Sequence, residues 1–291
     1  MEETGKTTST YEKAVIQDKE ARKALKEAKT KGEKLRLMKP PSLTSLFYEG
    51  TKQLLLLDFH GGGFCFKSPL DNDEYCSFLN RMYGFNVLNF DFSSSAKGAY
   101  PTQILEAEKQ YRNLLKKRPD LSGCKLFIVG HSSGGNLAAA LTLLLRREGI
   151  AVSGLLLDYP LPDLSRAPAS RPVYQETFPD WLLDDWTRMY CPSKELLTNP
   201  LVSPLLMSKE EAALFPPTYV VTSETDRLHD DGLVFAELLK QCGVPSEHFR
   251  AQERHGFIER HMRNVYLTPE NPSVVYAKKI TIQSFNWLLS R

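Results

Sequence analysis

Short apolar runs alternate with amphipathic stretches along most of the chain. The runs are unbroken and are bounded by Gly, Pro or polar residues, as expected of strands buried on both faces. They lie at 53–59, 86–92, 125–129, 154–159 and 218–222, with a further strand expected at 247–252 and one candidate near 43–49. Helical spacing predicts helices near 71–83, 102–118, 133–148 and 230–242, and a last covering helix at the end of the chain. This alternation predicts parallel βαβ crossovers and an open α/β sheet covered on both sides.

Two segments depart from the alternation. Residues 1–40 are charged and poor in β-branched residues, and their apolar positions lie roughly along one helical face, which predicts one or two helices. The connection from about 161 to 216 is rich in Pro and aromatic residues and is too long for an ordinary loop. We expect an inserted helical cap there, with a helix around 180–190, over the carboxyl ends of the strands where ligands bind in open α/β sheets. The alternative is an ordinary crossover helix with decorated loops.

Composition narrows the class of protein. A chain of 291 residues that is 42% hydrophobic can bury one large core, so one domain with an insertion is expected. The net charge of +2 comes without a clustered basic face, which argues against a nucleic-acid partner. The five cysteines are scattered without C-x-x-C spacing, which favours a reducing, cytoplasmic location over a zinc site or a disulfide framework. The first residues do not have the pattern of a secretory leader and the apolar runs are short, so we expect no stable membrane insertion.

A serine bracketed by glycines forms the first candidate for chemistry. The apolar run 125–129 leads into Gly130-His131-Ser132-Ser133-Gly134, and a helical pattern follows. A serine at the tip of a strand-to-helix turn has a strained backbone, so the residues two before and two after it must be nearly free of side chain. Gly130 and Gly134 meet this requirement, and the helix N-terminus would favour negative charge at Ser132. The alternative is a glycine-rich surface loop that spells G-x-S-x-G by chance.

A serine hydroxyl is a poor nucleophile, so Ser132 needs a base within hydrogen-bond reach. Of the six histidines, His255 is the best candidate because it follows the last expected strand, where the chain returns across the top of the sheet. Gly256 leaves its ring room to turn inward. His131 is expected to point away from Ser132, and His60 belongs to another motif. His229, His248 and His261 are expected to be solvated or structural.

The acid that orients this base is expected after a neighbouring strand. Asp226 follows the run 218–222 after a short turn, at the carboxyl end of a strand and on the side where Ser132 must lie. Competing carboxylates are Glu224, Asp230, Asp231 and Asp158. Of these, Asp230 and Asp231 are better placed to stabilise the N-terminus of the following helix.

Three successive glycines form the second candidate motif. His60-Gly61-Gly62-Gly63 directly follows the apolar run 54–59. Glycines expose backbone N–H groups, and these donors, with the amide of Ser133, could converge on the oxyanion that forms when Ser132 attacks a carbonyl. Phosphate binding is disfavoured because the loop has neither of the glycine patterns that bind nucleotides. His60 is expected to hold the loop by hydrogen bonding or to serve as a plain turn residue.

Together these motifs resemble the hormone-sensitive-lipase-like serine esterases, a branch of the α/β-hydrolase fold that carries HGGG upstream of G-x-S-x-G. The similarity runs from about Leu54 to the C-terminus and includes Ser203-Pro204 and the segment 226–232, which is similar to D-P-L-x-D-E-G. It implies an α/β-hydrolase domain at 41–291, to whose cap residues 1–40 contribute. The implied roles are nucleophile for Ser132, base for His255, orienting acid for Asp226, oxyanion donors for Gly62, Gly63 and Ser133, and loop shaping for Gly61.

The chain also departs from this family. His131 and Ser133 flank the serine where the family has Asp and Ala, and Arg227 stands in place of a proline. The segment 93–97 replaces an arginine-leucine-alanine-proline-glutamate stretch. Because only one strand candidate precedes residue 53, the sheet is expected to be short at that edge.

We therefore expect a serine hydrolase that cleaves small-molecule carboxylic esters of small or medium acyl groups through an acyl-enzyme. Trp181, Trp186 and neighbouring apolar residues of the cap are expected to line the pocket. Neither a metal nor an organic cofactor is required. Alternatives are an amidase or deacetylase that uses the same triad and a non-catalytic ligand receptor of the same fold. The sequence also allows a homodimer.

Overall fold

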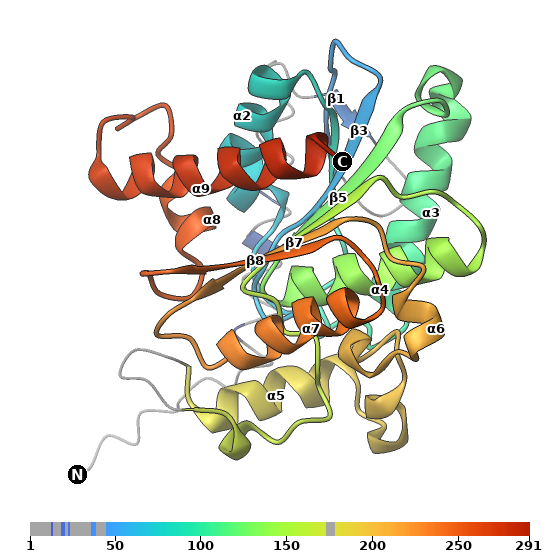
Figure 1. Cartoon of the computed structure of the whole chain (residues 1–291), viewed down its shortest axis with the longest axis vertical. Helices are drawn as coiled ribbons and strands as arrows, with labels where there is room; N and C mark the ends of the chain where they lie inside the picture. Colours follow the sequence, from blue (N-terminus) through green and yellow to red (C-terminus); the bar gives the residue numbers. More distant parts are fainter. Residues whose placement is uncertain (1–12, 14–18, 21–22, 24–35, 39–44, 173–177) are drawn as a thin grey trace.

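A twisted, mostly parallel sheet runs through the molecule (Figure 1). The computed structural model describes residues 13, 19–20, 23, 36–38, 45–172 and 178–291. The strands are β1 (Arg36–Met38), β2 (Ser45–Tyr48), β3 (Leu54–Phe59), β4 (Asn86–Asn89), β5 (Lys125–His131), β6 (Gly154–Asp158), β7 (Thr218–Ser223) and β8 (Ser246–Ala251). Their order in the sheet is β1-β2-β4-β3-β5-β6-β7-β8. The pairs β1–β2 and β2–β4 are antiparallel, and the other pairs are parallel.

The sequence pattern predicted β2 to β8, and the structure confirms these strands and their mostly parallel arrangement. It did not predict β1. Arg36–Met38 lies inside the segment 1–40, so the helical prediction is wrong at these residues and the sheet is not short at this edge. A three-residue edge strand needs no long apolar run, which is why periodicity did not reveal it. Most of residues 1–40, and their predicted contribution to the cap, lie outside the described residues.

Helices cover both faces of the sheet (Figure 1). One face carries α3 (Thr102–Lys117), α4 (Ser133–Arg147) and α7 (His229–Gln241), and the other carries α2 (Asp73–Tyr83), α8 (Phe257–Met262) and α9 (Pro272–Leu289). Successive residues of a strand point to opposite faces. Leu55 and Leu57 of β3 therefore join the core under α4, whereas Leu56 joins the core under α9. Burial on both faces explains the unbroken apolar runs.

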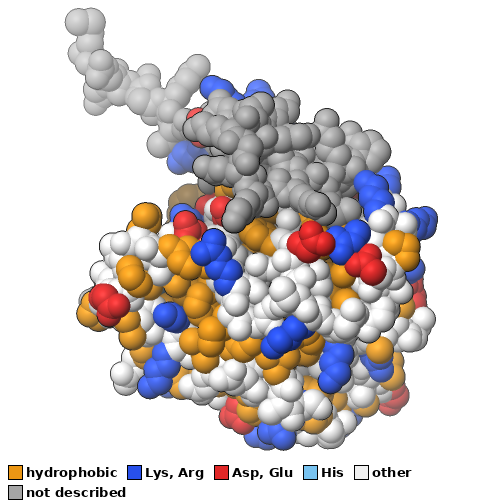
Figure 2. Space-filling view, turned by 90° about the horizontal axis from the view of Figure 1, so that it is seen from above, with side chains coloured by type: hydrophobic (Ala, Val, Ile, Leu, Met, Phe, Trp, Pro, Cys, Tyr) orange, Lys and Arg blue, Asp and Glu red, His pale blue; other side chains and the backbone are white. Residues whose placement is uncertain are grey.

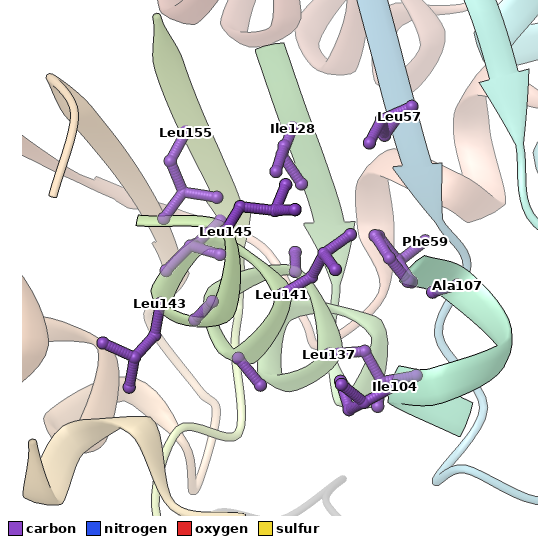
Figure 3. Close-up of a cluster of buried hydrophobic side chains, with 14 of the residues drawn as sticks. Leu57, Phe59, Ile104, Ala107, Ile128, Leu137, Leu141, Leu143, Leu145 and Leu155 are labelled. Atoms are coloured by element: carbon purple, nitrogen blue, oxygen red, sulfur yellow. The ribbon is translucent and has the colours of Figure 1, made fainter. Parts of the chain in front are cut away.

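The helix α4 is held in place by a stripe of leucines. Leu137, Leu141 and Leu145 recur every fourth residue and face the sheet, where Ile128 of β5 and Leu155 of β6 lie (Figure 3). All three leucines are fully buried, and each contributes about 2 kcal/mol of hydrophobic free energy. This packing fixes the N-terminus of α4, and therefore the turn that contains Ser132, at the carboxyl end of β5.

The described residues of the long connection between β6 and β7 divide into a helix beyond the carboxyl ends of the strands and a later part that packs against α4 and α7 (Figure 1). The connection contains α5 (Asp180–Tyr190) and α6 (Lys209–Ala212), and the short 3-10 helices η3 (Pro168–Ser170), η4 (Lys194–Thr198) and η5 (Pro204–Leu206). The helix predicted around 180–190 is confirmed by α5. Two further 3-10 helices, η1 (Pro69–Asn72) and η2 (Pro119–Leu121), lie elsewhere in the chain.

The surface carries both signs of charge. Among the described residues on the face that Figure 2 shows, Lys and Arg side chains lie scattered, with Asp and Glu between some of them. Within the described ranges, no helix combines the length and the apolar character that crossing a bilayer requires.

Candidate active site

Ser132 lies at a sharp turn between β5 and α4. Its backbone has φ 55° and ψ −121°, an uncommon conformation for a residue with a side chain. The turn also passes very close to neighbouring backbone. A Cβ atom added to Gly134 would lie 2.3 Å from the carbonyl oxygen of His60, and one added to Gly130 would lie 2.3 Å from that of Gly134. The two glycines therefore allow the backbone to approach closely, as the sequence pattern predicted.

The structure brings together the three side chains that the sequence assigned to a triad. Ser132 Oγ lies 2.8 Å from His255 Nε2, and His255 Nδ1 lies 2.6 Å from Asp226 Oδ2. The second carboxylate oxygen of Asp226 accepts the backbone N–H of Leu228 at 3.0 Å. Asp226 is almost fully buried, whereas about a fifth of the His255 side chain is exposed. The hydroxyl is thus connected to a carboxylate through an imidazole that solvent can still reach.

Aromatic rings and one backbone contact hold the imidazole of His255 in place. The rings of Tyr159 and Phe178 pack edge-on against it, with centroids 4.9 and 5.1 Å away. Arg260 Nη2 donates a hydrogen bond to the carbonyl oxygen of His255 at 3.0 Å. These contacts restrict the orientation of the ring that faces Ser132.

The competing histidines and carboxylates have partners of their own. His229 and His248 both contact the hydroxyl of Thr222, each at 2.8 Å, and His261 lies 3.9 Å from Glu253. Asp231 pairs with Arg166 and Arg171. Asp158 contacts His131, at 3.0 Å from its Nδ1, instead of His255. The geometry therefore favours His255 and Asp226 over these alternatives.

His131 forms a buried ionic cluster below the turn. Its Nδ1 lies 3.0 Å from Asp158 Oδ2 and its Nε2 lies 3.3 Å from Asp58 Oδ1, and all three side chains are fully buried. Burial alone would lower the pKa of His131, but the contacts with the two carboxylates outweigh burial and raise the pKa to about 10. His131 is therefore charged at neutral pH and partly compensates two buried carboxylates.

This cluster predicts that stability falls as the pH rises. Folding raises the pKa of His131 from its usual ~6.5 to about 10. The stability that the charged His131 gives to the folded protein is therefore fully present at a pH below its unfolded pKa, and it is lost as the pH rises through its folded pKa. We expect the free energy of unfolding in urea to fall by roughly 1 kcal/mol per pH unit between about pH 7 and 8.5. Nitrogen NMR of the histidine rings should show His131 doubly protonated across that range. A neutral His131 ring near pH 7 would contradict the assignment.

The glycine loop lies against the turn and is held from two sides. The N–H of Phe64 donates to Ser133 Oγ at 3.1 Å, so the serine that replaces the family's alanine ties the loop to α4. On the other side, the N–H of Gly61 donates to Glu259 Oε1 at 3.0 Å. The backbone N–H groups of Gly62 and Gly63 form no hydrogen bond within the described part of the chain. These two donors, with that of Ser133 at the start of α4, are available to an oxyanion.

Glu259 and Lys67 support this loop and were not found from the sequence. Lys67 Nζ lies 2.9 Å from Glu259 Oε2, and the Glu259 side chain is almost fully buried. Burial would raise the pKa of Glu259, but the charges of Lys67 and His131 and the bonds from Lys67 and Gly61 lower it to about 2. Its charge is thus maintained at neutral pH. Because 198 residues separate Glu259 from Gly61, no local motif reveals the contact.

His60 also contacts the loop that it begins. Its Nδ1 lies 2.8 Å from the carbonyl oxygen of Gly61, and its ring stacks on Phe92 with centroids 4.3 Å apart. Burial lowers the pKa of His60, which favours a neutral ring.

A pocket of about 270 Å³ opens at Ser132. It is lined by Gly62, Gly63, Lys67, Ser132, Trp186, His255, Gly256, Glu259, Arg260 and Arg263. Trp186 reaches in from α5 and covers Gly63, where an added Cβ would lie 2.3 Å from the indole ring. Trp181 is 58% exposed and does not line this pocket, so its predicted role is wrong. The expected apolar lining is also incomplete, because four of the ten lining residues, Lys67, Glu259, Arg260 and Arg263, are charged.

Arg227, which departs from the family pattern, anchors the long connection next to the triad. Its side chain is almost fully buried and donates to the carbonyl oxygens of Phe178 at 3.1 Å and Pro168 at 2.7 Å. It also pairs with Asp180 at the start of α5. Since Arg227 directly follows Asp226, these contacts join the connection to the loop that carries the acid.

Comparisons with known proteins agree with this geometry. A family model described as the alpha/beta hydrolase fold matches residues 56–259. The arylesterase of Saccharolobus solfataricus is 28% identical over 217 residues, which cover 72% of this chain and 69% of that protein. The ethyl acetate hydrolase of Pseudomonas putida is 31% identical over 198 residues, which cover 65% of this chain and only 61% of that protein's length.

A solved structure shows the same fold. The hyperthermophilic esterase of the archaeon Pyrobaculum calidifontis superimposes with a TM-score of 0.74 at 23% identity, covering 92% of this chain and 90% of that one. The family match spans most of the chain and includes the glycine loop, the serine turn, Asp226 and His255. The chain therefore belongs to the α/β-hydrolase fold family, in its hormone-sensitive-lipase-like branch.

Proposed function

We propose that this protein is a serine hydrolase that cleaves carboxylic esters of small or medium acyl groups. The observation that carries the proposal is the continuous contact from Ser132 Oγ through His255 to Asp226, at 2.8 and 2.6 Å. The pocket of about 270 Å³ lies below the ~300–1,000 Å³ of sites for drug-sized ligands, which supports a small substrate. The names of the arylesterase and ethyl acetate hydrolase relatives support the ester class.

The first half of the reaction forms an acyl-enzyme. His255 Nε2 takes the proton of the Ser132 hydroxyl while the oxygen attacks the carbonyl carbon of the ester. Asp226 keeps a proton on Nδ1, so that Nε2 is free to accept, and stabilises the imidazolium that forms. The negative oxygen receives hydrogen bonds from the N–H groups of Gly62, Gly63 and Ser133. His255 then gives its proton to the departing alcohol as the carbon–oxygen bond breaks.

The second half releases the acid. A water molecule attacks the acyl carbon and gives one proton to His255, and the same oxyanion donors stabilise the second tetrahedral intermediate. When that intermediate collapses, the proton returns to Ser132 Oγ. The enzyme is regenerated, and one ester and one water become one acid and one alcohol.

The two alternatives are weaker. An amidase or deacetylase would use the same three residues, but the relatives' names support esters. A non-catalytic receptor does not require a base within bonding distance of the serine, whereas this chain has one. The cytoplasmic location and the homodimer stay predictions of the sequence.

A matched ester and amide test the reaction class. We expect kcat/KM for p-nitrophenyl butyrate to exceed that for the corresponding butyryl nitroanilide by roughly 10²-fold or more, because the amide's leaving nitrogen depends far more on proton transfer. Release of nitrophenol and nitroaniline can be followed by absorbance in parallel. Faster cleavage of the amide would favour the amidase, and no turnover of either compound by folded protein would favour the receptor.

A further inference from the structure

Charged side chains form part of the wall of the pocket. Apart from the triad and the glycines, the wall consists of Lys67, Trp186, Glu259, Arg260 and Arg263, and of these only Trp186 is uncharged. A neutral alkyl chain placed here would take water away from charged groups without offering them a partner, which costs free energy. A substrate with a charge of its own would not incur that cost.

The charges in the wall do not cancel. Glu259 is paired with Lys67 at 2.9 Å, and Arg263 is paired with Asp71 at 2.5 Å. Arg260 lies exposed on α8 and donates one hydrogen bond to the carbonyl oxygen of His255. Within the described residues, no carboxylate lies within ion-pair distance of its guanidinium. One uncompensated positive charge is therefore held beside the candidate base.

We propose that the esters cleaved in this pocket carry a carboxylate a few bonds from the scissile carbonyl, and that Arg260 binds this carboxylate. The inference rests on the proposed function and names its substrate class. A guanidinium has five N–H donors, and its planar fork matches a carboxylate. Since Arg260 uses one donor on His255, the others are available. The volume of the pocket restricts the class to small molecules such as monoesters of dicarboxylic acids or acetyl esters of hydroxy acids.

Isosteric substrate pairs separate charge from size. Monomethyl glutarate carries the carboxylate in the acid part, and its control has an isopropyl group in place of the carboxylate. The acetate ester of γ-hydroxybutyrate carries the carboxylate in the alcohol part, and its control again has an isopropyl group in place of the carboxylate. Acid release is followed by pH-stat titration. We expect the charged member of at least one pair to have the higher kcat/KM, and that preference to weaken with added salt.

Substitutions then test Arg260 itself. In Arg260→Gln, the ratio of kcat/KM for the charged ester to that for its neutral isostere should fall roughly ten- to a hundredfold, because a charge-assisted contact is lost. Arg260→Lys should retain part of the preference. Arg112→Gln is the matched control, because it removes the same charge from an exposed position on α3. That variant should keep the wild-type ratio.

The outcomes distinguish this inference from the proposed function. Equal or better cleavage of both neutral isosteres by wild type, or a charge preference that Arg260→Gln leaves unchanged, would overturn the carboxylate proposal while the esterase remains. Failure of the folded wild type to cleave any of these esters, or p-nitrophenyl butyrate, would overturn the proposed function instead.

Discussion

Replacing Ser132 with alanine is expected to lower kcat/KM for p-nitrophenyl butyrate by roughly 10³- to 10⁶-fold. Alanine removes the oxygen that lies 2.8 Å from His255 Nε2, so no acyl-enzyme forms. The residual rate comes from the oxyanion donors and from substrate binding alone. Alanine keeps the Cβ atom, so the backbone strain at φ 55° is the same in both proteins. The thermal midpoint should therefore stay close to that of wild type.

Ser122→Ala is the matched control for this experiment, because Ser122 is exposed and its hydroxyl bonds only locally to the carbonyl oxygen of Pro119. It should retain full activity. If Ser132→Ala kept more than about a tenth of the wild-type rate, the loss would be far too small for a nucleophile, and the assignment would fail.

The second large effect is expected from Asp226→Asn, with a fall in kcat of roughly 10⁴-fold. The asparagine can keep the bond from the N–H of Leu228 through its oxygen, which turns its NH₂ group toward His255 Nδ1. His255 must then carry its proton on Nε2, where it can no longer accept the proton of Ser132. A steady-state assay measures the loss of rate, and circular dichroism checks that the fold is unchanged.

Asp230→Asn provides the control for this substitution. Asp230 lies four residues further on, in the first turn of α7, and its carboxylate takes no part in the triad. We expect its activity to stay within about twofold of wild type, because Asp230 is only partly buried and lies outside the triad. If Asp230→Asn lost as much activity as Asp226→Asn, the orienting acid would have been assigned wrongly.

Much of the fold and of the site could be predicted from local sequence. The unbroken apolar runs mark strands buried on both faces, and the leucines of α4 recur at helical spacing. Gly130 and Gly134 bracket Ser132 because the turn leaves no room for a Cβ. These features depend on neighbours within a few residues, so a single sequence reveals them.

The features that escaped prediction depend on distant contacts. Glu259 and Lys67 meet only because α8 returns beside the glycine loop. Trp181 and Trp186 both lie on α5, and only the packing of that helix decides that Trp186 covers Gly63 while Trp181 faces solvent. Residue type alone does not indicate which tryptophan is covered and which is exposed. The charged side chains in the pocket wall were missed because they too are brought together by contacts between distant parts of the chain.

The departures from the family pattern were visible in the sequence, but their partners were not. His131 lies between Asp58 and Asp158, and Ser133 accepts the N–H of Phe64. Each substitution therefore comes with a compensating contact elsewhere in the chain. A pattern of single residues shows that something has changed, whereas the contacts show what the change does.

The central claim is that Ser132, activated by His255 and Asp226, is the nucleophile. The most direct measurement is reaction of the folded protein with a fluorophosphonate, followed by intact mass and peptide mapping. The account predicts one adduct per chain, located on Ser132, absent from Ser132→Ala and formed far more slowly by Asp226→Asn. An adduct on another residue, or none on folded wild-type protein, would contradict it.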